Sequence, residues 1–285
     1  MMYDTLGAKT IELNGARYYV RDSGSGKDSI LLLHGWPDDS TVWRNQVLVL
    51  LEAGYRVICP DLLGYGLSDK PQDVERYTFS ALVNDMVSLL NCLGLEKVHC
   101  IAHDYGAVIG WDFATVYPNR LKTFVAMSVG HLASLLDISF DVLRYQWYLF
   151  LNIHKVAPQL YRASNGRLLR EVLRTHPDRE QIVNRVLELG VFESMGKLEQ
   201  ANPFPEILLA ALQGELPKPL PVTVPTLGIW STKDDFLWES HMKDSGKYVT
   251  AEWCYEQLEG AGHWFMLEQP QTTNHLLLNW LLKHP

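Results

Sequence analysis

Residues 101–107, Ile-Ala-His-Asp-Tyr-Gly-Ala, end one apolar run and open a segment with helical periodicity. Small residues stand two positions before and two positions after Asp104. This spacing is typical of a strand that turns sharply into a helix, because the turn crowds the backbone around a strained central residue. The stretch therefore predicts a buried strand, a tight turn that carries Asp104, and a helix that follows at once.

The carboxylate at this turn determines the chemistry that we expect there. An aspartate has a reference pKa of about 3.9 and is already an anion at neutral pH, whereas a serine must be deprotonated as it attacks. Attack of a carboxylate on carbon leaves an alkyl ester. We therefore expect Asp104 to act as a nucleophile, and the alternative is an acid that only caps the helix.

Short apolar runs alternate with helix-period segments on both sides of this turn. The expected strands are 30–33, 56–59, 98–102, 124–129, 222–230 and 251–258, and the expected helices are 42–51, 79–95, 105–116 and 273–282. Such alternation is typical of an α/β protein with a mostly parallel central sheet and helices on both faces. Asn14-Gly15, between two alternating runs, predicts a hairpin at the start of the fold.

The pattern changes between residues 131 and 218. Helix-period segments follow one another there with no strand between them, at 135–151, 166–173, 179–189 and 205–212. This arrangement predicts an all-helical cap inserted into a core that is split into residues 1–130 and 219–285. The Pro-rich stretch 217–225 marks the return of the chain to the sheet.

The composition excludes several classes of protein. Of the 285 residues 47% are hydrophobic and 20% are charged, and the net charge of -8 disfavours binding to nucleic acid or to a membrane surface. The first 24 residues contain no sustained apolar stretch, so we expect a cytoplasmic protein. No His, Cys, Asp or Glu cluster has the spacing of metal ligands, and no metal or organic cofactor is expected. The sequence does not indicate the oligomeric state.

A second motif, His34-Gly35-Trp36-Pro37, follows an expected strand. Open α/β sheets bind their ligands at the carboxyl ends of the strands. There the backbone N–H of Trp36 can stabilise a developing anion together with the N–H of Tyr105, the residue after the nucleophile. We expect His34 and Trp36 to lie at the substrate site, and the alternative is a plain Gly-Pro turn.

Two later motifs complete the set. Asp234 and Asp235 follow the strand 222–230, and one of them can supply the carboxylate that orients a histidine. The spacing after the strand favours Asp234, with Asp235 as a solvated turn acid. His263 is the only one of ten histidines that follows a strand in a glycine-rich loop late in the chain, after nucleophile and acid. This order predicts a triad of Asp104, Asp234 and His263.

Together these motifs make the chain resemble an α/β-hydrolase of the epoxide hydrolase and haloalkane dehalogenase branch. Fluoroacetate dehalogenases follow the nucleophile with arginine, and haloalkane dehalogenases usually follow it with tryptophan and often carry asparagine after the His-Gly pair. This chain has Tyr105 and Trp36 at those places. His-Gly-aromatic-Pro is the usual form in epoxide hydrolases, which the chain resembles most.

The resemblance implies a proton donor in the cap, because opening an epoxide releases a strongly basic alkoxide. Family members use cap tyrosines, whose phenol of pKa about 10 stays protonated. We expect Tyr148 to donate, with Tyr145 as the close alternative at i, i+3 spacing. Trp147 is expected to contact the substrate, and the alternative for these aromatic residues is packing within the cap. A second family tyrosine is absent, and residues 198–202 stand in its place.

The resemblance implies that water converts a small, neutral, apolar epoxide to a vicinal diol in two steps. Asp104 attacks an epoxide carbon, and His263, oriented by Asp234, then activates the water that hydrolyses the ester. One alternative is a haloalkane dehalogenase with the same triad. The other is a non-catalytic receptor for a small molecule on the same fold, against which the complete triad argues.

Overall fold

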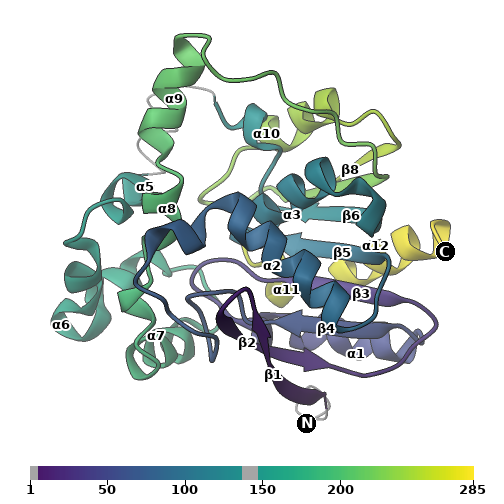
Figure 1. Ribbon diagram of the computed structural model, residues 1–285, viewed down its shortest axis with the longest axis horizontal. Coiled ribbons are helices and arrows are strands. Elements are labelled where there is room, and N and C mark those ends of the chain that lie inside the picture. The colour runs from purple at the N-terminus through teal and green to yellow at the C-terminus, as the bar shows by residue number, and fades with distance from the viewer. Residues whose placement is uncertain (1–5, 137–146) are drawn as a thin grey trace.

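The computed structural model describes residues 6–136 and 147–285. A central sheet has the strand order β1-β2-β4-β3-β5-β6-β7-β8, as Figure 1 shows. β2 pairs antiparallel with both β1 and β4, and all other pairs are parallel. The strands are β1 (Gly7–Leu13), β2 (Ala16–Asp22), β3 (Ser29–Leu33), β4 (Arg56–Pro60), β5 (Val98–His103), β6 (Leu121–Met127), β7 (Thr226–Ser231) and β8 (Trp253–Leu258).

Helices cover both faces of this sheet. α2 (Phe79–Cys92) packs beside α3 (Tyr105–Val116) on one face, whereas α1 (Arg44–Glu52), α11 (Phe265–Glu268) and α12 (Pro270–Lys283) contact one another on the opposite face (Figure 1). α10 (Glu239–Asp244) contacts β7. Every residue of β3 and β5 is buried, as expected for parallel strands covered on both sides. The predicted mostly parallel α/β fold is confirmed.

The first turn and two strand boundaries show how local chemistry shapes the sheet. Asn14 and Gly15 have φ values of 50° and 84°, as the predicted hairpin turn requires. β6 ends at Met127 rather than at 129, because Ser128 takes a positive φ of 67°. The strand predicted from 222 begins only at Thr226, after Pro225, and Val222 forms just an isolated bridge. Proline has no N–H to donate to a ladder.

The helices between β6 and β7 gather beside one end of the sheet, drawn in green in Figure 1. In the described part of this segment they are α5 (Trp147–Asn152), α6 (Ala157–Val172), α7 (Arg179–Glu188), α8 (Lys197–Ala201) and α9 (Phe204–Leu212). α6 starts nine residues before the predicted 166 and is interrupted at 163–166, where three residues take positive φ. α8 was not predicted. Most of the helix predicted at 135–151 lies outside the described residues.

Two structural features are absent from the described ranges. No helix in residues 6–136 and 147–285 combines the length and the apolarity needed to cross a membrane. The same residues contain no group of His, Cys, Asp and Glu side chains arranged to hold a metal ion.

Candidate active site

Asp104 occupies a strained turn between β5 and α3. Its φ of 52° and ψ of -121° lie in a region that side chains rarely adopt. Two glycines allow this geometry: a Cβ on Gly106 would lie 2.3 Å from the carbonyl oxygen of Leu33, and a Cβ on Gly35 would lie 2.3 Å from the Cβ of Asp104. The small residues therefore hold the carboxylate at the end of the strand.

The two oxygens of Asp104 have different surroundings. The backbone N–H of Trp36 donates to Oδ1 at 2.7 Å, and His263 Nε2 lies 3.6 Å from Oδ2. Tyr105 begins α3, so its N–H has no partner within the helix. Burial raises the pKa of Asp104, but the imidazole of His263 and the Trp36 N–H outweigh burial and lower it overall. Asp104 is therefore a carboxylate whose Oδ1 accepts the Trp36 N–H and whose Oδ2 faces His263.

Asp234 holds His263 from the other side. Its Oδ2 accepts a hydrogen bond from His263 Nδ1 at 2.9 Å. Its Oδ1 accepts from the backbone N–H groups of Phe236 and Leu237 at 2.8 and 3.0 Å, which fixes the carboxylate. Asp235 points away and pairs with Arg174 at 3.2 Å. The structure thus brings Asp104, His263 and Asp234 together in a line and leaves Asp235 outside.

The two carboxylates control the charge of His263. Burial lowers the pKa of this histidine, but Asp234 and Asp104 together raise it to about 10. The imidazole is therefore protonated while Asp104 is an anion. Loss of the negative charge on Asp104 removes one of the two groups that stabilise the imidazolium, so its pKa must fall.

His34 and His103 support the backbone of the site. His34 Nε2 accepts from the backbone N–H of Leu62 at 2.8 Å, and its Nδ1 donates to the carbonyl of Gly35 at 2.9 Å. His103 Nε2 lies 3.0 Å from the carbonyl oxygen of His263. Both rings are fully buried. His34 was predicted to lie at the substrate site. Both of its ring nitrogens instead bind backbone, and it is not among the residues that line the spaces at Asp104.

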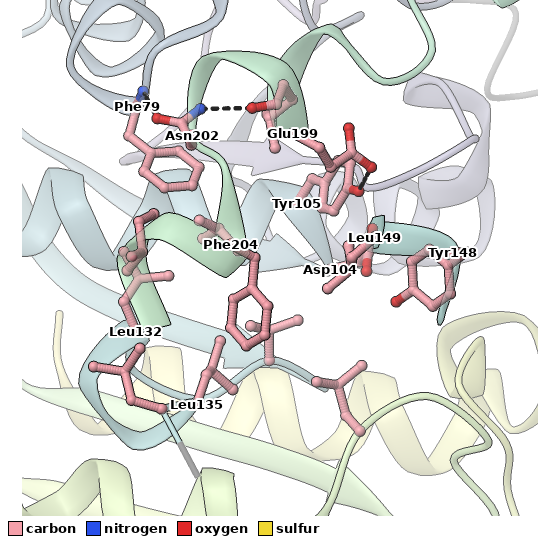
Figure 2. A pocket seen from close by; sticks show the side chains of 16 residues that line it. Phe79, Asp104, Tyr105, Leu132, Leu135, Tyr148, Leu149, Glu199, Asn202 and Phe204 are labelled. Atoms are coloured by element: carbon pink, nitrogen blue, oxygen red, sulfur yellow. Dashed lines mark hydrogen bonds between the residues drawn. The ribbon is translucent and has the colours of Figure 1, made fainter. Parts of the chain in front are cut away.

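A cavity of about 140 Å³ opens at Asp104 between the sheet and the inserted helices (Figure 2). Most of its lining is apolar, and the polar side chains among the lining residues are Asp104, Tyr105, Tyr148, Glu199 and Asn202. A smaller space that also reaches Asp104 is lined by Trp36, Tyr105, Tyr148, Phe236, His263 and Trp264. The apolar side chains that line the larger cavity are Phe79, Val108, Val129, Leu132, Leu135, Leu136, Leu149, Leu198, Phe204, Ile207 and Leu237.

The aromatic residues predicted in the cap differ in their positions. Tyr148 is buried, lines both spaces, and stacks on Trp36 with ring centroids 6.2 Å apart. Burial is the main cause that raises the pKa of Tyr148, and the charge of Asp104 adds to it, so the phenol keeps its proton. Trp147 is 43% exposed and lines neither space, because neighbouring residues of a helix face different directions. Tyr145 lies outside the described residues.

The sequence did not point to Glu199, which is buried in α8. The hydroxyl of Tyr105 and the side-chain amide of Asn152 both donate hydrogen bonds to Glu199 Oε1. Tyr161 donates in turn to Asn152 Oδ1 at 2.9 Å. A single acid in a five-residue helix has no periodic signal in the sequence. The only sequence signal near Glu199 was that residues 198–202 stand where the second cap tyrosine of the family is expected.

Comparisons with known proteins agree with this architecture. Residues 28–270 match the family described as the alpha/beta hydrolase fold. The chain is 30% identical to epoxide hydrolase 4 of Homo sapiens over 95% of this chain and 77% of that protein. It is 27% identical to bifunctional epoxide hydrolase 2 of Sus scrofa over 94% of this chain, and it spans only 53% of that relative's length.

A solved structure shows the same fold. The epoxide hydrolase of Bacillus megaterium, crystallised with an inhibitor, superposes with a TM-score of 0.85 and 25% identity, covering 96% of this chain and 99% of that one. The resemblance inferred from the motifs is confirmed by the family match and by these relatives. The chain therefore belongs to the α/β-hydrolase fold family, in its epoxide hydrolase branch.

Proposed function

We propose that the protein is an epoxide hydrolase that opens a neutral, apolar epoxide through an alkyl ester on Asp104. The observation that carries the proposal is the buried Asp104 carboxylate at an apolar cavity, with Oδ1 bound by the Trp36 N–H and Oδ2 facing His263. The human and porcine relatives named epoxide hydrolases support the reaction class.

In the first step, Asp104 Oδ2 attacks an epoxide carbon and the C–O bond of the ring breaks. The electron pair of that bond stays on the ring oxygen, which needs a proton. Tyr148 lines the same spaces as Asp104 and keeps its proton, so it is suited to donate. The product of this step is a hydroxyalkyl ester.

In the second step, His263 acts as a base. Esterification removes the charge on Asp104, so the pKa of His263 falls. The imidazolium then gives up a proton, which restores the Tyr148 phenol that donated in the first step, and the neutral imidazole remains. His263, held by Asp234, takes a proton from water, and the water oxygen attacks the ester carbonyl carbon. The backbone N–H groups of Trp36 and Tyr105 stabilise the oxyanion on Oδ1. Cleavage releases the diol and restores the carboxylate.

The lining of the larger cavity suggests the substrate class. Its surface is mainly aliphatic and aromatic, and no Lys or Arg occurs among its described lining residues. This environment favours a small epoxide without a charged group. We also infer that the helices between β6 and β7, within residues 131–218, act as the cap that closes this cavity over Asp104.

Trapping the ester tests the proposal. The variant His263→Gln can be alkylated but should hydrolyse the ester poorly. After incubation with styrene oxide, intact mass spectrometry should show a gain equal to the whole epoxide, localised to Asp104 by peptide mapping. The double variant with Asp104→Ala is the control and should show no adduct.

The same experiment with haloalkanes separates the alternatives. A gain of the alkyl group after loss of halide, with no gain from epoxides, would assign the protein as a dehalogenase. Absence of any adduct, together with ligand binding that survives Asp104→Ala, would indicate a receptor.

A further inference from the structure

Glu199 is a buried acid that the steps above leave unused. It lines the same cavity as Asp104 and is only 4% exposed. The hydrogen bonds from Tyr105 and Asn152 both end on Oε1, and Oε2 is buried with no hydrogen-bond partner among the described residues. A buried charged oxygen without a donor is strongly unfavourable, whereas the uncharged carbonyl oxygen of the neutral acid costs less.

The surroundings of Glu199 also favour the neutral acid. Burial is the largest cause that raises its pKa, the charge of Asp104 raises it further, and the hydrogen bonds from Tyr105 and Asn152 only partly oppose these effects. Five ionisable groups that interact with Glu199 are Asp104, Tyr65, Tyr105, Tyr148 and Tyr161. None of these five can carry a positive charge, so none stabilises the carboxylate as a cation would.

The hydrogen bond between Tyr105 and Glu199 can run in either direction. When Glu199 is ionised, the Tyr105 hydroxyl donates to it. When Glu199 is the neutral acid, its O–H can donate to the Tyr105 oxygen, and the hydroxyl hydrogen of Tyr105 is then free to donate elsewhere. Tyr105 lines both spaces that meet at Asp104, and Figure 2 shows its phenol beside the Glu199 carboxyl.

We propose that Tyr105 and Glu199 form a second proton-donating pair for the oxygen that leaves the epoxide carbon. Tyr105 is the catalytic residue that touches this oxygen, and Glu199 is the positioning residue that orients Tyr105 and returns a proton to it. This inference rests on the proposed function.

The proton balance of the pair closes over one turnover. As the ring C–O bond breaks, its electron pair stays on the oxygen, which takes the Tyr105 proton while the Glu199 proton passes to Tyr105. Glu199 is left as a carboxylate. Hydrolysis of the ester by one water then yields the diol, the Asp104 carboxylate and one proton, which restores the acid form of Glu199.

The test measures the rate of ester formation in the His263→Gln background, where the ester accumulates and can be followed by rapid quenching and intact mass. Glu199→Gln keeps the size of the side chain and its hydrogen bond to Tyr105 but cannot supply a proton. We expect it to slow alkylation by butylene oxide about 10- to 100-fold. Tyr105→Phe should give a similar loss, and the double variant should lose no more, because the two residues act as one pair.

The matched control is Glu193→Gln, which removes an exposed acid of the same segment. Glu193 pairs with Arg162 at the surface, with about half of its side chain exposed. Alkylation should stay within about twofold of the parent rate in this variant.

Two readouts separate proton donation from a purely structural role. Trifluoromethyloxirane releases a less basic alkoxide than butylene oxide and needs the proton less, so the loss in Glu199→Gln should shrink with it. The parent rate should also fall as the pH rises through the pKa of Glu199, because only the acid form recharges Tyr105. That fall should disappear in Glu199→Gln.

The outcomes are distinct. An unchanged alkylation rate in Glu199→Gln, or a loss that is the same for both epoxides at every pH, overturns the inference and leaves the proposed function intact. If the His263→Gln parent forms no adduct with either epoxide, both the inference and the proposed function are overturned. If thermal unfolding shows that Glu199→Gln does not fold, Tyr105→Phe, which keeps the aromatic ring, provides the test. A loss in alkylation rate that is larger with butylene oxide than with trifluoromethyloxirane supports the pair, and an equal loss refutes it.

Discussion

The two sides of the cavity differ in what positions their functional groups. On the sheet side, Asp104, Asp234 and His263 each follow a strand end, and glycines or backbone N–H groups hold them within a few residues of that strand. On the side of the inserted helices, Tyr148 and Glu199 depend on packing between segments far apart in the sequence. Short-range geometry therefore positions Asp104, Asp234 and His263, and tertiary packing positions Tyr148 and Glu199.

The largest effect should come from the centre of the sheet side. Asp104→Ala removes the atom that forms the ester, and we expect diol formation from styrene oxide to fall by about 10⁴-fold or more. The melting temperature should change little, because alanine keeps the Cβ of Asp104 and the turn that Gly35 and Gly106 allow. Diol production measured by chromatography, at matched melting temperature, checks this. Residual turnover within tenfold of the parent, about 1.4 kcal/mol of activation free energy, would contradict the assignment of the nucleophile.

The neighbouring acids Asp234 and Asp235 provide a matched pair on the same side. Asp234→Asn should slow hydrolysis of the ester about 10³- to 10⁴-fold, because the histidine loses the carboxylate that fixes its tautomer. The alkyl-enzyme should then accumulate in single-turnover mass spectra. Asp235→Asn removes only a surface ion pair and should stay within about twofold of the parent. Equal losses of the ester hydrolysis rate in the two variants would show that the hydrogen bond from His263 to Asp234 does not contribute to this step.

The adjacent aromatics Trp147 and Tyr148 sharpen the comparison on the other side. Tyr148→Phe keeps the stacking on Trp36 but removes the proton donor, and alkylation should slow about 10- to 100-fold. Trp147→Phe changes an exposed ring that lines neither space, so the rate should change less than about twofold. The reverse result would mean that the two rings exchange places when substrate is bound.

The smallest effect concerns the charge of His263. Asp104→Asn removes one of two carboxylates beside the imidazolium, so the pKa of His263 should fall from about 10, as an NMR titration of the ring would show.

The sign for stability follows from linkage. The folded-state pKa of His263 is raised above its unfolded value. The stabilisation that the protonated ring adds to the free energy of unfolding is therefore complete below about pH 6.5, and it is lost as the pH rises towards about 10. Asp104→Asn should weaken this alkaline loss, which urea unfolding at neutral and alkaline pH would measure. An unchanged pKa of His263 would show that Asp104 does not act on it.

Local rules explain the parts of the fold that the sequence predicted well. α3 has the predicted bounds of 105–116, because the small residues around Asp104 specify a strand-to-helix turn. The Asn14-Gly15 hairpin follows from two residues that tolerate positive φ. The early start of α6 and the short helix α8 were missed because packing, not periodicity, sets such boundaries.

The amino-acid pattern alone was enough to predict the α/β class, the three residues Asp104, Asp234 and His263 that meet in the site, and the choice of Asp234 over Asp235 as the partner of His263. These follow from residues that act close to their own strand ends. Three features became visible only in the folded chain: His34 binds backbone, Trp147 faces outward, and Glu199 meets Tyr105 across 94 positions of the chain. Burial and pairing of a side chain depend on the segments that pack against it, and a pattern along one segment does not specify that neighbour.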